Sequence, residues 1–222
     1  MWPVGCAGYW AKGGPSRMSV EVKICGITTL DDARQAVAAG ADYIGCILYP
    51  RSVRAVTLET VCRIAEGVCG ARIVGVFVNV GPDAIQAAVR QAGLYAVQVH
   101  GDEAPAGYDV LPIPLWRAVS AGPQGIAPDP GLWPAAERIV IDAPAPGRYG
   151  GTGERADWNR ASQLAGRYRS MLAGGLNPGN VADAVRTVRP YGVDAASGVE
   201  LAPGQKDHAA VERFIQEAKG AL

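Results

Sequence analysis

Residues 22–28 read Val-Lys-Ile-Cys-Gly-Ile-Thr, and they mark the point where a predicted β-strand ends and a helix is about to begin. The apolar, partly β-branched run favours a strand, and the glycine and threonine that follow favour its end and a helix start. Side chains alternate across a strand, so Lys23 and Cys25 face one side while Val22 and Ile24 face the other. A thiol at the end of a strand, with a cation two residues before it, points to chemistry, although a free cysteine is more often a small buried apolar residue.

Short apolar segments alternate with amphipathic segments from here to the C-terminus. Thr29 before the first amphipathic segment and Gly40 after it are typical helix-start and helix-end residues. This alternation predicts strands over 20–25, 43–48, 72–78, 96–100, 115–119, 138–142, 170–173 and 192–195. It predicts helices over 29–39, 57–68, 82–92, 157–166, 180–188 and 208–219. Residues 101–114 are expected to hold at most a short helix, 121–131 a loop, and 132–137 one helical turn.

Short strands that are apolar on both faces and alternate with helices are typical of a parallel sheet covered by helices. Eight of them in a chain of 222 residues match an α/β fold of the (β/α)8 type, a TIM barrel formed by a single domain. An open doubly wound sheet is the alternative, because alternation alone does not show that the last strand pairs with the first. We assign 18–222 to the barrel, and we predict that 1–17, which lack periodicity, form a disordered or loosely attached extension with Met18 as the natural start of the domain.

Composition restricts the possible partners. Lys plus Arg and Asp plus Glu number 21 each without a basic cluster, which argues against nucleic acid and favours a small-molecule partner. No apolar run approaches the roughly 18 residues of a membrane span. The five cysteines, at 6, 25, 46, 62 and 69, lack the paired spacing of a zinc site or a redox motif, so we expect a reduced, cytoplasmic protein. The sequence does not decide between a monomer and a homodimer.

Chemically active side chains follow several of the predicted strands. In a (β/α)8 barrel the active site lies at the carboxyl ends of the strands. Cys25 ends the first strand, Arg54 lies in the segment after the second, Gln98 and His100 share one face of the fourth, and Asp142 ends the sixth. These residues are therefore expected at one end of the barrel.

Glycine-bearing turns follow the last three predicted strands, at 150–153, 174–178 and 196–198. Glycine lets backbone N–H groups approach an anion closely, and a helix N-terminus adds favourable partial charge. The second and third turns, in neighbouring loops, favour a phosphate site over ordinary tight turns. The first turn is the weaker case and is equally compatible with a flexible flap.

Seven blocks of this chain, in order and with matching spacing, resemble phosphoribosylanthranilate isomerases. The similarity runs from about Val22 to the segment before the last helix and leaves out only the N-terminal extension. The blocks are Lys-Ile-Cys-Gly-Ile-Thr at 23–28, Tyr-Pro-Arg-Ser-Val-Arg at 49–54, Gly-Val-Phe-Val-Asn at 75–79, Val-Gln-Val-His-Gly-Asp-Glu at 97–103, Gly-Gly-Thr-Gly at 150–153, Leu-Ala-Gly-Gly-Leu-Asn-Pro at 172–178 and Val-Asp-Ala-Ala-Ser-Gly-Val-Glu at 193–200.

The resemblance implies a (β/α)8 barrel of the tryptophan pathway that needs no metal and no organic cofactor. Its reaction is an Amadori rearrangement of an aminoaldose phosphate to an aminoketose phosphate. By position, Cys25 would be the general base, Asp142 the general acid, and Arg54 the group that holds the anthranilate carboxylate. The resemblance also implies further substrate contacts, with Asp194 lining the site and the phosphate held by Gly174, Gly175, Ser197 and Gly198.

Three positions depart from the family pattern. Val53 stands where the family usually has proline, Ala196 where it has the first of two serines, and Leu48 where it has phenylalanine. The first change is expected to loosen the Arg54 loop, and the second removes a possible hydroxyl donor to the phosphate. Neither change affects the implied acid or base.

Lys23 has two possible roles. Its ammonium could favour the Cys25 thiolate, although a strand repeat places it ~7 Å below the thiol. The favoured role is a pairing with an inward carboxylate such as Asp194 on the neighbouring strand.

Two other functions fit the glycine turns. Another sugar-phosphate isomerase or lyase on the same barrel would share the phosphate site, since that site is more widespread than any one chemistry. A non-catalytic phosphate-ligand binding protein would need neither acid nor base, and the presence of both Cys25 and Asp142 argues against it.

Overall fold

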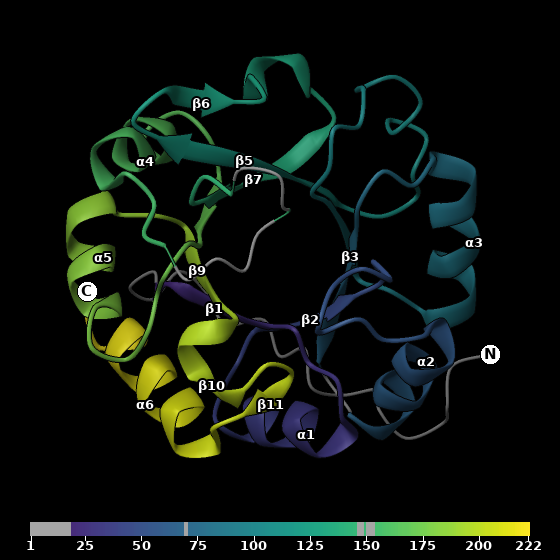
Figure 1. The fold of residues 1–222 in the computed structure, drawn as a ribbon, viewed down its shortest axis with the longest axis horizontal. Coiled ribbons are helices and arrows are strands. Elements are labelled where there is room, and N and C mark those ends of the chain that lie inside the picture. Colours follow the sequence, from purple (N-terminus) through teal and green to yellow (C-terminus); the bar gives the residue numbers. More distant parts are fainter. Residues whose placement is uncertain (1–18, 69–70, 146–148, 150–153) are drawn as a thin grey trace.

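The structure is a computed structural model, and it describes residues 19–68, 71–145, 149 and 154–222 (Figure 1). The predicted extension, residues 1–17, and the Gly-Gly-Thr-Gly turn at 150–153 lie outside the described residues. The described part contains a ring of strands surrounded by helices, which confirms the predicted single-domain (β/α)8 barrel.

Eight parallel strands form the ring. In their order around the barrel they are β4 (Ala96–Val99), β3 (Arg72–Phe77), β2 (Tyr43–Ile47), β1 (Glu21–Cys25), β9 (Gly192–Ala195), β8 (Ser170–Leu172), β7 (Ala136–Asp142) and β5 (Leu115–Gly122). The pairing of β4 with β5 closes the ring, so the alternative of an open doubly wound sheet is wrong. All eight predicted strands are present, with ends that differ by a few residues at most.

In the residues that the structure describes, six helices cover the outside of the ring (Figure 1), and all six were predicted. They are α1 (Leu30–Ala38), α2 (Leu58–Gly67), α3 (Pro82–Ala92), α4 (Trp158–Ala165), α5 (Val181–Val188) and α6 (His208–Lys219). Thr29 caps α1 as expected, because its side chain accepts a hydrogen bond of 3.1 Å from the Asp32 backbone N–H. In the described part of the chain, no helix is both long enough and apolar enough to span a membrane.

The connections around β5 and after β9 differ from the prediction. Strand β6 (Gly125–Ala127) pairs back on β5 within the predicted loop, because the turn between Gly122 and Gly125 allows a tight hairpin. The one turn expected at 132–137 is also misplaced: a short 3₁₀ helix, η1 (Pro130–Leu132), precedes it and β7 begins at Ala136. After β9, a second 3₁₀ turn, η2 (Ser197–Val199), leads into a small hairpin of β10 (Glu200–Ala202) and β11 (Gln205–Lys206). The segment between β4 and β5 contains no helix among the described residues.

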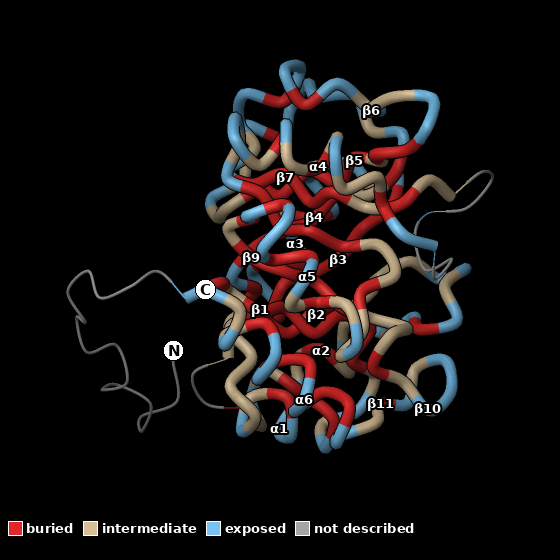
Figure 2. The backbone as a smooth tube through the Cα atoms, turned by 90° about the vertical axis from the view of Figure 1, so that its left-hand side faces the viewer, coloured by how far each residue is buried: buried red, intermediate tan, exposed pale blue. Residues whose placement is uncertain are grey.

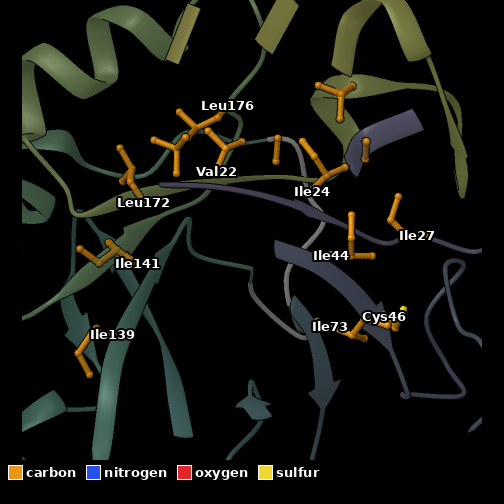
Figure 3. Packing of buried hydrophobic residues seen from close by; sticks show 14 of the residues in the cluster. Val22, Ile24, Ile27, Ile44, Cys46, Ile73, Ile139, Ile141, Leu172 and Leu176 are labelled. Carbon is orange, nitrogen blue, oxygen red and sulfur yellow. The ribbon is translucent and has the colours of Figure 1, made fainter. Parts of the chain in front are cut away.

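The apolar core has two layers. The larger layer fills the space between strands and helices and includes Val22 and Ile24, together with Ile44 and Leu172 (Figure 3). The smaller layer packs inside the ring around Tyr43, which belongs to the same inward-facing set as Lys23 and Cys25. The strands are buried along most of their length, whereas many of the connecting segments are exposed (Figure 2). Because Val22 and Ile24 belong to the outer layer while Lys23 and Cys25 face inward, the predicted alternation of side chains along the first strand is confirmed.

The amino-terminal end of the barrel is filled by large side chains. Arg138 is buried there and pairs with Glu21, and its guanidinium lies 5.0 Å from the centre of the Tyr43 ring and 4.8 Å from that of Trp116. The Tyr43 and Trp116 rings pack edge to face at 4.9 Å. Open space in the barrel therefore lies at the other end, beyond the carboxyl ends of the strands.

Candidate active site

A pocket of about 760 Å³, including the open space at its mouth, lies at the carboxyl ends of the barrel strands. Seven of the eight predicted site residues line it. They are Cys25, Asp142, Asp194, Gly174, Gly175, Ser197 and Gly198. The fold thus brings together residues from β1, β7 and β9 and from the glycine turns after β8 and β9. These residues are up to 173 positions apart in the sequence.

Cys25 ends β1 with its thiol against the backbone of the next strand. Its register partner on β2 is Gly45, and a methyl group at Gly45 would lie 2.7 Å from the sulfur. The absence of a side chain at Gly45 therefore makes room for the thiol. Burial raises the pKa of Cys25 above its ordinary value of 9.0, while the charge of Lys23 opposes that rise. The free protein consequently holds this thiol mainly in its protonated form at neutral pH.

Lys23 pairs with Asp194, as the favoured interpretation of the sequence predicted. The two residues are opposite each other on β1 and β9, and Lys23 Nζ lies 2.8 Å from Asp194 Oδ2. Lys23 is fully buried, which lowers its pKa, but the charges of Asp194 and Cys25 outweigh burial and raise the pKa overall. The charge of its ammonium also acts to lower the pKa of the Cys25 thiol, although burial outweighs this effect. The predicted pairing of Lys23 with Asp194 is thus confirmed, and its effect on the Cys25 thiolate stays a prediction.

Asp142 ends β7 on the opposite side of the pocket, three strand positions from Cys25 around the ring. Its Oδ1 accepts a hydrogen bond of 2.7 Å from the Ala143 N–H, and its Oδ2 lies 3.5 Å from His100 Nε2. Burial raises the pKa of Asp142 above its ordinary 3.8 and outweighs that hydrogen bond and the charge of Lys23. Burial and the nearby charges of Lys23 and Arg117 lower the pKa of His100 to about 4. At neutral pH His100 is therefore uncharged and does not hold Asp142 as a carboxylate.

Two buried oxygens in the pocket lack a hydrogen-bond partner within the described residues. They are Gln98 Oε1 on β4 and Asp194 Oδ1 on β9. A buried acceptor without a donor costs free energy, about 1–3 kcal/mol for a neutral group and more for a charged one. Both oxygens are therefore positioned to accept hydrogen bonds from hydroxyl or amine groups of a ligand.

The two glycine turns after β8 and β9 meet at one side of the pocket. A methyl group at Gly198 would lie 1.9 Å from the Leu176 carbonyl oxygen, and Gly174 has a φ of 78° and little space beside Ala143. Within the described residues, the N–H groups of Gly174, Gly175, Ser197 and Gly198 donate to no acceptor of the chain. Four unpaired N–H groups at one wall are a suitable environment for an anion such as phosphate.

Arg54 is the predicted site residue that does not line the pocket. Its side chain crosses Gly26, where a methyl group would lie 2.6 Å from Arg54 Cδ, and it ends on Glu200. In this structure the carboxylate that Arg54 binds thus belongs to the chain itself. Of the family departures, Ala196 lines the pocket, whereas Val53 is 72% exposed on the Arg54 loop.

The sequence interpretation missed several pocket residues. Tyr49 and Tyr149 line the mouth with their rings packed edge to face at 5.9 Å, and the Tyr149 hydroxyl hydrogen-bonds Asn79 and Asp102. Tyr49 and Asn79 occur within quoted sequence blocks, but nothing in their spacing indicates that they meet. Among the described residues, no group of three or more His, Cys, Asp or Glu side chains is arranged to hold a metal ion.

Comparison with known proteins gives a consistent result. The model of a family described as N-(5'phosphoribosyl)anthranilate (PRA) isomerase matches residues 22–217. An N-(5'-phosphoribosyl)anthranilate isomerase of Myxococcus xanthus is 46% identical over 208 residues, which are 91% of this chain and 97% of that protein.

Solved structures are similar over the same region. One is of monomers generated from the dimeric phosphoribosylanthranilate isomerase of Thermotoga maritima, with a TM-score of 0.76, 37% identity, and coverage of 90% of this chain and 99% of that one. Another is a phosphoribosylanthranilate isomerase in complex with reduced 1-(o-carboxyphenylamino)-1-deoxyribulose 5-phosphate, with a TM-score of 0.75, 36% identity, and the same two coverages.

Proposed function

Because the chain belongs to the N-(5'-phosphoribosyl)anthranilate isomerase family, we propose that Cys25 and Asp142 are the base and the acid of its reaction. The enzyme converts N-(5'-phosphoribosyl)anthranilate to 1-(2-carboxyphenylamino)-1-deoxyribulose 5-phosphate in tryptophan biosynthesis. The observation that carries the proposed roles is the position of the two side chains, which approach one pocket from different strands.

The reaction is an Amadori rearrangement and requires two proton transfers. Asp142 protonates the furanose ring oxygen, and the sugar opens as an iminium ion. Cys25 as thiolate then removes the proton from the adjacent sugar carbon, which gives an enolamine that tautomerises to the ketone. The acid must carry its proton and the base must lack one in the same molecule.

Burial favours the protonated form of Asp142, which the acid needs, and disfavours the thiolate form of Cys25, which the base needs. The raised pKa of Asp142 helps it to keep its proton, whereas burial works against the Cys25 thiolate. Lys23 offsets part of this effect, since the charge of its ammonium acts to lower the pKa of the thiol and Asp194 keeps the ammonium charged. We therefore assign to Lys23 the role of stabilising the thiolate when it forms.

The remaining groups bind the substrate. We assign the phosphate to the unpaired N–H groups of the turns at 174–175 and 197–198, which replace the hydroxyl donor that Ala196 lacks. Asp194 Oδ1 and Gln98 Oε1 are assigned to substrate hydroxyl or amine groups. Arg54 is assigned to the anthranilate carboxylate, because a planar guanidinium offers two parallel donors to that group.

The catalytic domain is proposed to comprise residues 18–222, with 1–17 outside it. We further propose a cytoplasmic enzyme that is a monomer or a homodimer; a dimeric relative is known from Thermotoga maritima. Light scattering of the purified chain would determine its oligomeric state.

The test of the assigned roles is turnover by the purified chain, followed as the loss of phosphoribosylanthranilate fluorescence. We expect turnover by the unmodified protein and a large loss in Cys25→Ala and in Asp142→Asn. Turnover of a different sugar phosphate alone would indicate another isomerase or lyase, and binding without turnover a phosphate-ligand binding protein. Parental activity in Cys25→Ala would show that another residue is the base.

A further inference from the structure

Glu200 holds Arg54 along one edge of its guanidinium group. Arg54 Nε lies 2.8 Å from Glu200 Oε1 and 3.1 Å from Oε2, and Arg54 Nη2 lies 2.7 Å from Oε2. Arg54 Nη1 makes no hydrogen bond to any described residue. The donors on the edge of the guanidinium that contains Nη1 are therefore unused within the described residues and could bind a second carboxylate.

Lys206 fixes Glu200 from the other side. Its ammonium is buried and donates to Glu200 Oε1 at 2.8 Å, to the Cys25 carbonyl oxygen at 2.6 Å and to the Ala196 carbonyl oxygen at 3.2 Å. Glu200 and Lys206 are opposite each other in the β10–β11 hairpin. The hairpin thus attaches Glu200 to the end of β1 and to the glycine turn after β9, both of which line the pocket.

The charges of this group suit an anionic ligand. Burial alone would raise the pKa of Glu200, but the hydrogen bonds from Arg54 and Lys206 outweigh it and lower the pKa. Glu200 is consequently a carboxylate at neutral pH. Two cations and one anion, Arg54, Lys206 and Glu200, leave a net charge of +1, beside the Cys25 backbone. A ligand carboxylate would neutralise it.

We propose that Glu200, fixed by Lys206, is a positioning residue that directs the free edge of Arg54 toward the carboxylate of the substrate. This inference rests on the proposed function, since it takes the anthranilate group as the source of that carboxylate. Arg54 passes over Gly26, the residue after Cys25, and its charge interacts with the Cys25 side chain. The carboxylate is then bound next to the sugar carbon that reacts.

The experiment compares the affinities of two ligands for the full chain. One is reduced 1-(o-carboxyphenylamino)-1-deoxyribulose 5-phosphate, and the other is the same compound without the carboxyl group. We expect the parent protein to prefer the carboxylated ligand by about tenfold or more, because the carboxylate gains charged hydrogen bonds. Glu200→Gln should reduce this preference to within a few-fold and leave the affinity for the other ligand unchanged. With phosphoribosylanthranilate, the same variant should raise KM more than it lowers kcat.

Two other roles for Glu200 predict different results. If only net charge matters, Glu200→Gln makes the group more positive and the preference should increase. If Glu200 merely supports the fold, both ligands should lose affinity equally. Either outcome would overturn the proposal. Glu200→Asp keeps the charge but is one methylene shorter, so it should also lose the preference, and it provides the test if Glu200→Gln does not fold.

Glu103→Gln is the matched control. Glu103 is a buried carboxylate that pairs with buried Arg117 at 2.6 Å, at the same end of the barrel but without contact with Arg54. This variant should be less stable than the parent, yet its preference for the carboxylated ligand should be unchanged. Failure of the parent chain to turn over phosphoribosylanthranilate would count against the proposed function. A parent that turns it over, with unchanged ligand preference in Glu200→Gln and Glu200→Asp, would count against the role of Glu200 alone.

Discussion

Lys23 Nζ and Asp194 Oδ2 lie 2.8 Å apart inside the barrel, on strands whose register places the two residues opposite each other. Both are buried, and the charge of the same ammonium acts to lower the pKa of the Cys25 thiol against the effect of burial. The carboxylate keeps the buried ammonium charged, and that charge favours the thiolate form of Cys25, which is the form that the proposed mechanism requires.

Removal of Lys23 should destabilise the protein. Lys23→Met leaves the Asp194 carboxylate buried without its cation, which typically costs about 3–5 kcal/mol. Urea denaturation at neutral pH measures the loss, and the double variant Lys23→Met, Asp194→Leu should recover much of it. The pKa of Lys23 is raised above its ordinary 10.5, so its contribution is complete below pH 10.5 and is lost as the pH rises further. A single variant as stable as the parent would contradict a stabilising pair.

Replacement of the acid or the base should remove most of the activity. Cys25→Ala and Asp142→Asn are each expected to lower kcat by on the order of 10² to 10⁴, because each removes one proton transfer. Circular dichroism should show an intact fold. Cys62→Ala is the control, since this half-buried cysteine lies on α2 outside the pocket. An equal loss in the control would indicate a general effect of cysteine removal.

The dependence of kcat/KM on pH should be a broad bell. We expect the pKa of Cys25, raised from 9.0, to stay above that of Asp142, raised from 3.8, so the active protonation state is a minor one. Below the pKa of Asp142, nearly all of Asp142 is already protonated, so a further fall in pH only lowers the fraction of Cys25 that is thiolate. Above the pKa of Cys25, nearly all of Cys25 is already thiolate, so a further rise in pH only lowers the fraction of Asp142 that is protonated. The acid limb therefore reports Asp142 and the alkaline limb Cys25. Cys25→Asp, with a more acidic base, should move the alkaline limb to lower pH, and an unmoved limb would assign it to another group.

Arg54 should contribute chiefly to substrate binding. Arg54→Ala should raise KM about tenfold or more with a smaller effect on kcat, since a charged hydrogen bond contributes about 1.5–3 kcal/mol. Arg54→Lys should recover little, because an ammonium cannot donate two parallel hydrogen bonds. Arg51→Ala tests the same loop at an exposed position and should have little effect. Unchanged KM values in both Arg54 variants would place the carboxylate elsewhere.

The N-terminal extension should be dispensable. A chain that begins at Met18 keeps the whole barrel, so its melting temperature and kcat/KM should equal those of the full chain. Thermal unfolding and the fluorescence assay provide the two measurements. A clear decrease in either would show that residues 1–17 contribute to the domain.

The barrel and the positions of Cys25 and Asp142 at its strand ends could be predicted because they depend on local patterns. Short apolar strands and capped helices are properties of neighbouring residues, and a barrel places every strand end at one face. Even the pairing of Lys23 with Asp194 follows from alternation along two strands. The hairpin of β5 and β6 was missed because its few residues at 121–127 look like an ordinary glycine-containing loop.

The group around Arg54 could not be predicted in the same way. Lys206 contacts a carbonyl oxygen 181 residues earlier, and Glu200 meets Arg54 across 146 residues. Such contacts depend on how two loops pack after the barrel has closed, for which strand periodicity gives no information. Likewise, the shifted pKa values of Cys25 and Asp142 reflect burial, which depends on the complete fold.

The packing of Arg138 against Tyr43 and Trp116 has a consequence for how molecules enter and leave the enzyme. These side chains fill the amino end of the barrel in the described part of the chain, so substrate and product must use the opening at the other end. Substrate and product therefore compete for the same opening and the same pocket. The product should act as a competitive inhibitor, and net flux through this step should depend on how quickly the next enzyme takes the product out of solution.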